Sequence, residues 1–209
     1  DQEYLDTIKN INSDMEFLEQ CNIGGEFMKP DDQERVKDIG SKKIEFNGLK
    51  QNFLSDNEIQ NLNIPKGTLL PEEREIINDH IVITIEMLEQ LPYPKNLKNI
   101  PEFAGGHHEK MDGTGYPKGL SEHQMSTQAK IMAIADIYEA LTAADRPYKE
   151  GKKLSQAMRI MGFMKNDYHI DEELFEIFVK SGVYKKYAKD YVNIDQIDNV
   201  DEAAVIGVK

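Results

Sequence analysis

Four residues whose side chains commonly bind metals fall on stretches of this chain that are otherwise apolar. They are His80, the adjacent pair His107 and His108, and Asp136. Three imidazoles and a carboxylate are a sufficient ligand set for one divalent metal with open coordination positions. No histidine precedes His80 in the chain, so a second metal would have to find its ligands among carboxylates and amides. We take these four residues as candidate metal ligands.

Each candidate also has an ordinary structural explanation. A single histidine on an apolar helix face is more often a hydrogen-bonded core residue than a ligand, and Asp136 could instead pair with an arginine or a lysine. The combination favours the metal, because adjacent histidines at a helix end project roughly 100° apart and can serve one metal or two. His123 and His169 lie in polar stretches, and we expect both to be solvated.

The elements that position these residues are predicted to be helices nearly throughout. Apolar residues recur with helical spacing in residues 4–19, 72–91, 100–107, 128–144, 154–164 and 171–179. His80 shares a face with apolar residues, which predicts that it points at the core. The helix over 128–144 is apolar on nearly all sides and is expected to be central, with Asp136 buried in its middle. Asp171 is predicted to be an N-cap.

The remaining segments give weaker signals. Residues 41–64 are polar and rich in asparagine, and we expect a loop and a short helix there. The tail after residue 194 is first acidic and then small and apolar, and it is assigned no firm structure. The predicted fold class is therefore all-α.

Composition excludes several classes of function. The chain has 209 residues and a formal charge of −13, with 38 acidic and 25 basic residues, which argues against nucleic acid as the partner. A single cysteine, Cys21, excludes an internal disulfide and suits a reducing compartment, with the cytoplasm as the default. No apolar run is long enough to span a membrane. The chain begins with Asp1, which suggests that it is part of a longer protein.

A run of motifs around the candidate ligands resembles one known family. The motifs are His107-His108-Glu109, Asp112-Gly113-Thr114-Gly115-Tyr116-Pro117, Ala135-Asp136 and Asp145-Arg146-Pro147-Tyr148. In order and spacing they resemble the HD-GYP phosphodiesterases, strongly over residues 67–150. The resemblance implies an HD-domain-like helical bundle from bacterial signalling, whose members hydrolyse cyclic di-GMP at a site with two or three metals.

The resemblance also implies roles for individual residues. His80, His107, His108 and Asp136 match metal ligands of the family. Arg146 and Lys149 match residues that hold the phosphates or bases of the substrate, and Tyr116 belongs to the loop that gives the family its name. No residue is assigned a catalytic role. On the residues alone, Arg146 is explained almost equally well by pairing with Asp145 or Glu139.

The chain departs from the family pattern before the His80 helix. There the family carries a His-Asp dyad, followed shortly by a lysine, and the ungapped register places Gln51, Asn52 and Ser55 at those positions. None of these side chains replaces an imidazole, a carboxylate or an ammonium group. Asp56 would need a local shift of register to take part. The resemblance thus implies a helical lead-in and divergent first part over residues 1–66, a helical core over 67–195 and a tail over 196–209.

Two functions from different classes follow. The first is a metal-binding sensor or relay domain of cyclic di-GMP signalling, with one iron, manganese or zinc ion and impaired or lost hydrolysis. The alternative is an active phosphodiesterase that uses the remaining ligands. The expected partners are a cyclic dinucleotide and an upstream sensor domain, and the amphipathic helix at the start of the chain could form a homodimer.

Overall fold

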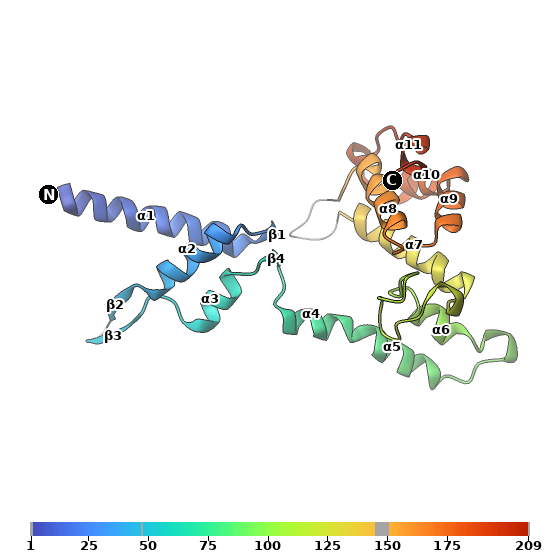
Figure 1. Ribbon diagram of the computed structural model, residues 1–209, viewed down its shortest axis with the longest axis horizontal. Helices are drawn as coiled ribbons and strands as arrows, with labels where there is room; N and C mark the ends of the chain where they lie inside the picture. Colours follow the sequence, from blue (N-terminus) through green and yellow to red (C-terminus); the bar gives the residue numbers. More distant parts are fainter. Residues whose placement is uncertain (1, 47, 145–150, 209) are drawn as a thin grey trace. The chain divides into compact units, whose positions relative to one another are not determined.

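The computed structural model describes residues 2–46, 48–144 and 151–208 (Figure 1). It forms two compact units, residues 1–78 and 79–209. Helices dominate both, which confirms the all-α fold class. The sequence placed boundaries after residues 66 and 195, and these remain predictions. Among the described residues, no helix is long and apolar enough to cross a membrane.

The first unit combines helices with two small antiparallel strand pairs. Its elements are α1 (Gln2–Ile23), β1 (Gly25–Phe27), α2 (Pro30–Ser41), β2 (Lys43–Phe46), β3 (Leu49–Asn52), α3 (Asp56–Leu62), β4 (Lys66–Gly67) and α4 (Pro71–Asn78). Strand β1 pairs with β4, and β2 pairs with β3 as a hairpin. The hairpin replaces part of the loop expected over 41–64, since four residues on each side form a regular ladder.

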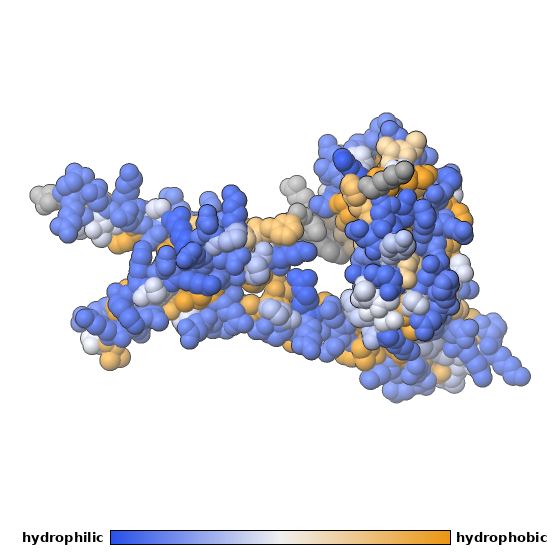
Figure 2. Space-filling model, in the orientation of Figure 1, coloured by the Kyte–Doolittle hydropathy of each residue, from blue (hydrophilic) through white to orange (hydrophobic). Residues whose placement is uncertain are grey.

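Helix α1 buries none of its residues among the described part of the chain. Its apolar stripe, including Ile8, Ile11 and Met15, is exposed. Asp14 on this helix pairs with Arg35 and Lys42 of the following segment, and Arg35 also lies over the ring of Phe17. The visible surface is largely hydrophilic, with apolar patches scattered over it (Figure 2).

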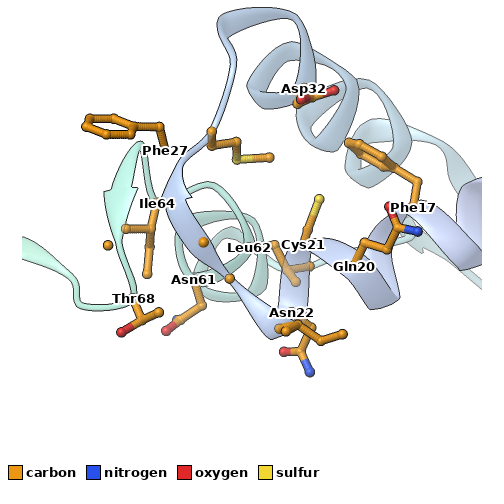
Figure 3. Close-up of a pocket in the computed structure, with 15 residues that line it drawn as sticks. Phe17, Gln20, Cys21, Asn22, Phe27, Asp32, Asn61, Leu62, Ile64 and Thr68 are labelled. Carbon is orange, nitrogen blue, oxygen red and sulfur yellow. The ribbon is translucent and has the colours of Figure 1, made fainter. Parts of the chain in front are cut away.

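A cavity of about 300 Å³ lies in this unit, among the end of α1, β1 and the end of α3 (Figure 3). Phe17 and Cys21 reach it from α1, and Asn61 and Leu62 from α3. Burial raises the pKa of the Cys21 thiol, and the nearby charge of Asp32 adds to the effect. Because a protonated thiol is a poor nucleophile, this environment disfavours a catalytic role for Cys21.

The second unit is helical. Its elements are α5 (His80–Glu89), α6 (Ile100–Gly105), α7 (Thr127–Thr142), α8 (Leu154–Asn166), α9 (Glu172–Lys180), α10 (Val183–Tyr191) and α11 (Glu202–Ile206), with short 3₁₀ turns at Lys95–Leu97, Glu122–Gln124 and Ile194–Gln196. The single helix expected over 72–91 is two helices, which meet at Asp79. The buried residues of α5 are Ile81 and Ile85. His80 at its start is exposed, so the prediction that His80 faces the core is wrong.

The main core lies among α7 to α11. Tyr138, Met158, Phe175 and Tyr184 are nearly or fully buried there. The central position predicted for α7 holds on one face only, because Asp136 lies on the exposed face. The expectation that Asp136 is buried is therefore wrong.

The end of the chain is part of this core, although no firm structure was predicted for the residues after 194. Val205 on α11 is buried with the core residues. Lys165 on α8 donates to the carbonyl of Ile206 at 2.8 Å, and Gln196 donates to the carbonyls of Thr142 and Lys152 at 3.0 Å. Small apolar side chains thus complete the packing of α8.

A buried ion pair joins α7 to the start of α9. Lys130 donates to Asp171 at 2.9 Å, and both side chains are largely buried. Asp171 also accepts from the backbone N–H of Leu174, which confirms it as the N-cap. Burial raises the pKa of Asp171, but the hydrogen bonds from Leu174 and Lys130 outweigh this effect and hold the pKa below its ordinary value.

We predict that Asp171→Ala lowers the free energy of unfolding by about 2 to 3 kcal/mol, since it removes a cap and leaves Lys130 with the more distant carboxylate of Glu122, at 3.6 Å. Asp171→Asn keeps the cap and should lose less. In the wild type, the contribution of Asp171 to the free energy of unfolding is complete above the ordinary carboxyl pKa. It is lost as the pH falls through the lowered pKa that Asp171 has in the folded protein. Urea unfolding at pH 7 and pH 3 measures the difference in stability between the wild type and each variant. Equal stability of the wild type and Asp171→Ala at pH 7 would contradict the prediction.

Candidate metal centre

Three of the four candidate ligands meet at one point of the second unit. Donor atoms of His80, His107 and His108 all lie within 4.8 Å of one another. His80 is the first residue of α5, while the other two follow the end of α6. The sequence predicted that a helix would carry His107, but α6 stops at Gly105 and the pair lies in a turn.

Close packing of helices brings the histidines together. A Cβ added to Gly105 would lie 2.5 Å from the Cδ1 atom of Ile85, so the glycine lets α6 approach α5 this closely without displacing the Ile85 side chain. At the next residue, a Cβ on Gly106 would lie 2.8 Å from the Cβ of Ala129 on α7. The turn with the histidine pair is therefore fixed between two helices.

The nitrogens have the arrangement that a metal ligand set needs. Nε2 of His108 lies 3.4 Å from Nε2 of His80. Two nitrogens bound tetrahedrally to one ion at about 2.0–2.1 Å lie about 3.3–3.4 Å apart. His107 donates from Nδ1 to the carbonyl of Ala104 at 2.6 Å, which leaves its Nε2 for an ion and fixes the ring. The site therefore fits one divalent metal.

The electrostatics of His108 also suit a ligand. Burial lowers its pKa to about 4, with His107 and His80 adding to the shift and Asp136 opposing it. The imidazole is therefore neutral at pH 7, and metals bind only the neutral form. His169 lowers the same pKa, so it lies near the site.

Asp136 is not among the three clustered ligands, although its charge acts on His108 and on Tyr116. It stands on the exposed face of α7, close enough to influence both rings. His169, which was expected to be solvated, is half-buried, and burial lowers its pKa. His123 is exposed as expected. No sequence signal pointed to His169, because only the fold brings its loop beside the site.

Tyr116 covers one side of the cluster. Its ring stacks on His108 with the ring centres 4.8 Å apart and the planes 17° from parallel. Burial raises the pKa of its hydroxyl, and the charge of Asp136 adds to the shift. The sequence assigned Tyr116 to substrate binding. The structure shows in addition that this ring restricts the orientation of His108.

A buried carboxylate organises the loop that carries Tyr116. Glu109 is 1% exposed and accepts from the backbone N–H groups of Lys118 at 2.7 Å and Leu120 at 2.8 Å. A Cβ on Gly115 would lie 2.5 Å from the Cα of Glu109, which only glycine permits. The sequence contained Glu109 within a motif but gave it no role. Its place beside two histidines was the available signal.

Three further candidate positions lie in the first unit. Gln51 and Asn52 are on β3, and Ser55 caps α3. Arg146 and Lys149 lie outside the described residues.

Comparison with known proteins shows the family. A family model for the HD domain matches residues 56–174. The chain belongs to the HD domain family. A cyclic di-GMP phosphodiesterase of Thermotoga maritima is 31% identical over 181 residues, which cover 79% of this chain and 48% of that protein. A cyclic di-GMP phosphodiesterase of Pseudomonas aeruginosa is 46% identical over 79 residues, 37% of this chain and 18% of that protein.

Relatives of a second specificity also match. A 3'3'-cGAMP-specific phosphodiesterase of Vibrio cholerae is 35% identical over 117 residues, which cover 55% of this chain and 24% of that protein. The chain thus spans between about a fifth and a half of the length of these relatives. The family match and these relatives confirm the HD-GYP resemblance that the motifs indicated.

We predict that Glu109→Gln destabilises the Tyr116 loop, at a cost of about 1 to 3 kcal/mol, because the amide has one acceptor and turns a donor toward a backbone N–H. Amide hydrogen exchange at Lys118 and Leu120 should accelerate, and urea unfolding should shift to lower concentration. Glu173→Gln, on an exposed helix position, is the matched control. Wild-type exchange at both amides in Glu109→Gln would contradict the role of this carboxylate.

Proposed function

We propose that this chain is an HD-GYP-type domain of cyclic di-GMP signalling which binds one divalent metal and hydrolyses its ligand slowly or not at all. His80, His107 and His108 hold the metal, and Asp136 orients a ligand from α7. The ion is iron, manganese or zinc. The observation that carries the proposal is the close grouping of three imidazole nitrogens. No second such group of His, Cys, Asp or Glu side chains occurs among the side chains that the structure describes.

The residues at the positions of the family dyad support the loss of hydrolysis. Asn52 accepts a hydrogen bond from Lys43 at 2.6 Å across the β2–β3 hairpin. Ser55 forms a capping box with Glu58 at the start of α3. These side chains stabilise local structure, and Gln51 beside them offers no carboxylate or imidazole either.

The chemistry of phosphodiester hydrolysis explains why this matters. A pair of ions about 3.5–4 Å apart stabilises both the attacking and the leaving oxygen. A bridging carboxylate holds such a pair, and the dyad would supply it. A single divalent ion bound by the three histidines would act as a Lewis acid and lower the pKa of a coordinated water. The leaving oxygen would then lack its own cation, so turnover is slow.

Ligand recognition in this proposal uses residues outside the histidine cluster. Arg146 and Lys149 contact the phosphates or bases, since an arginine fork suits bidentate phosphate binding. Tyr116 contributes a ring that already lies on His108. The partners are a cyclic dinucleotide and an upstream sensor domain in the cytoplasm of a bacterium, with homodimerisation through α1. Its exposed apolar stripe supports the last point.

The alternative is an active phosphodiesterase. The names of the similar proteins favour it, since those from Thermotoga maritima and Pseudomonas aeruginosa are cyclic di-GMP phosphodiesterases. In that case the second ion would take ligands outside the cluster. Metal content and turnover together separate the two functions.

We predict that the purified chain, loaded with excess iron, manganese or zinc and then desalted, retains about one metal per chain. His107→Ala should retain almost none, because it removes one of three ligands. His123→Ala, an exposed histidine, should keep the wild-type content. Elemental analysis decides the matter, and two or three retained ions per wild-type chain would contradict the proposal.

We also predict that the metal-loaded chain hydrolyses cyclic di-GMP far more slowly than the roughly 1 s⁻¹ at the low end of ordinary enzymes. More manganese or iron should not raise the rate, since the chain lacks the ligands that would hold a second ion. The rate of hydrolysis is measured by quantifying the product with chromatography, and His107→Ala gives the background rate. Turnover at an ordinary rate that is lost in His107→Ala would establish the active phosphodiesterase instead.

A further inference from the structure

A second pocket lies at the C-terminal end of α7, on the same helix as Asp136. Its volume is about 470 Å³, within the usual range for small-ligand sites. Glu139 lines it from α7, Tyr187 and Tyr191 line it from α10, and Asn193 follows that helix. The pocket therefore joins the exposed face of α7 to an aromatic wall.

The aromatic wall is anchored in the core. The rings of Tyr187 and Tyr191 lie 4.9 Å apart, with their planes at 36°. Tyr187 in turn packs edge-on against Tyr138, with the ring centres 5.7 Å apart, and the hydroxyl of Tyr138 donates to the buried carbonyl of Tyr184 at 3.0 Å. Tyr191 is nevertheless 75% exposed. An exposed ring on a fixed support is the arrangement on which nucleic-acid bases stack.

The carboxylate in the pocket selects among bases. Glu139 lines the same pocket as Tyr187 and Tyr191. Burial raises the pKa of Tyr187, and the charge of Glu139 adds to this effect. An ionised carboxylate only accepts hydrogen bonds. The Watson–Crick edge of guanine presents two adjacent donors, N1–H and the N2 amino group, which one carboxylate accepts with both oxygens. Adenine presents one donor beside an acceptor, which a carboxylate repels.

The position of the pocket relates it to the histidine cluster. Asp136 and Glu139 are three residues apart on α7, so they share a face and lie about 4.5 Å apart along the helix axis. Asp136 acts electrostatically on His108 and Tyr116. Successive turns of α7 therefore place Asp136 near a phosphate bound at the cluster and Glu139 near a base bound in the pocket.

We propose that this pocket holds one guanine base of the cyclic dinucleotide, stacked on Tyr191 and bound through its Watson–Crick edge by Glu139. The inference rests on the proposed function for the identity of the ligand. It assigns base selection to α7 and α10, away from the residues that hold the metal. Ligands without guanine are then disfavoured.

Calorimetry on the full chain with cyclic di-GMP and cyclic di-AMP tests the assignment. Tyr191→Ala should weaken cyclic di-GMP about tenfold, the scale of one lost base stack. Glu139→Gln should reduce the preference for cyclic di-GMP over cyclic di-AMP, because the amide carries a donor. Glu16→Gln, which changes an exposed residue of α1, is the matched control. Metal content should stay at the wild-type value in all three variants.

A second measurement separates the pocket from the proposed function. Ligand-observed NMR with GMP and AMP needs neither metal nor a cyclic substrate, and GMP should bind the wild type better than it binds Tyr191→Ala. GMP binding that depends on Tyr191, without any cyclic di-GMP binding, would support the guanine site and refute the proposed function. Equal binding of cyclic di-GMP by wild type, Tyr191→Ala and Glu139→Gln would overturn the guanine site. Absence of GMP binding to the wild type would overturn it as well.

Discussion

The close approach of α5 and α6 is the constraint on which the candidate site depends. Ile85 fills the space that a side chain on Gly105 would need, so the helices touch at the backbone of α6. This contact places the start of α5 beside the turn that follows α6. The three histidines meet because apolar packing fixes the backbone that carries them, and any metal affinity is built on that packing.

A second layer of contacts orients the rings within this frame. The carbonyl of Ala104 fixes one ring nitrogen of His107, and Tyr116 lies flat on His108. Glu109 holds the loop of Tyr116 by two backbone hydrogen bonds. Burial of His108 keeps it neutral at physiological pH. The orientation and charge of the histidine rings and the conformation of the loop are therefore set by neighbouring groups that are not candidate ligands.

Membership of the HD domain family and the fate of its chemistry are separate questions in this chain. The motifs from His107 to Asp136 keep the family order, while Asn52 and Ser55 contribute to a hairpin and a helix cap. A fold can persist while a metal ligand set shrinks, because packing and ligation use different side chains. A domain that still binds but rarely cleaves would be suited to relaying a signal.

The sequence by itself determined the helical class, the family and the three histidines, since these follow from periodicity and from motif order. It also located the N-cap at Asp171. It did not determine the exposure of His80 and Asp136, because an apolar helix does not reveal which of its faces finds a partner. The half-burial of His169, the support from Glu109 and the docking of α11 depend on contacts between residues distant in sequence. Only the tertiary structure decided those, since side-chain environment is a property of packing between elements.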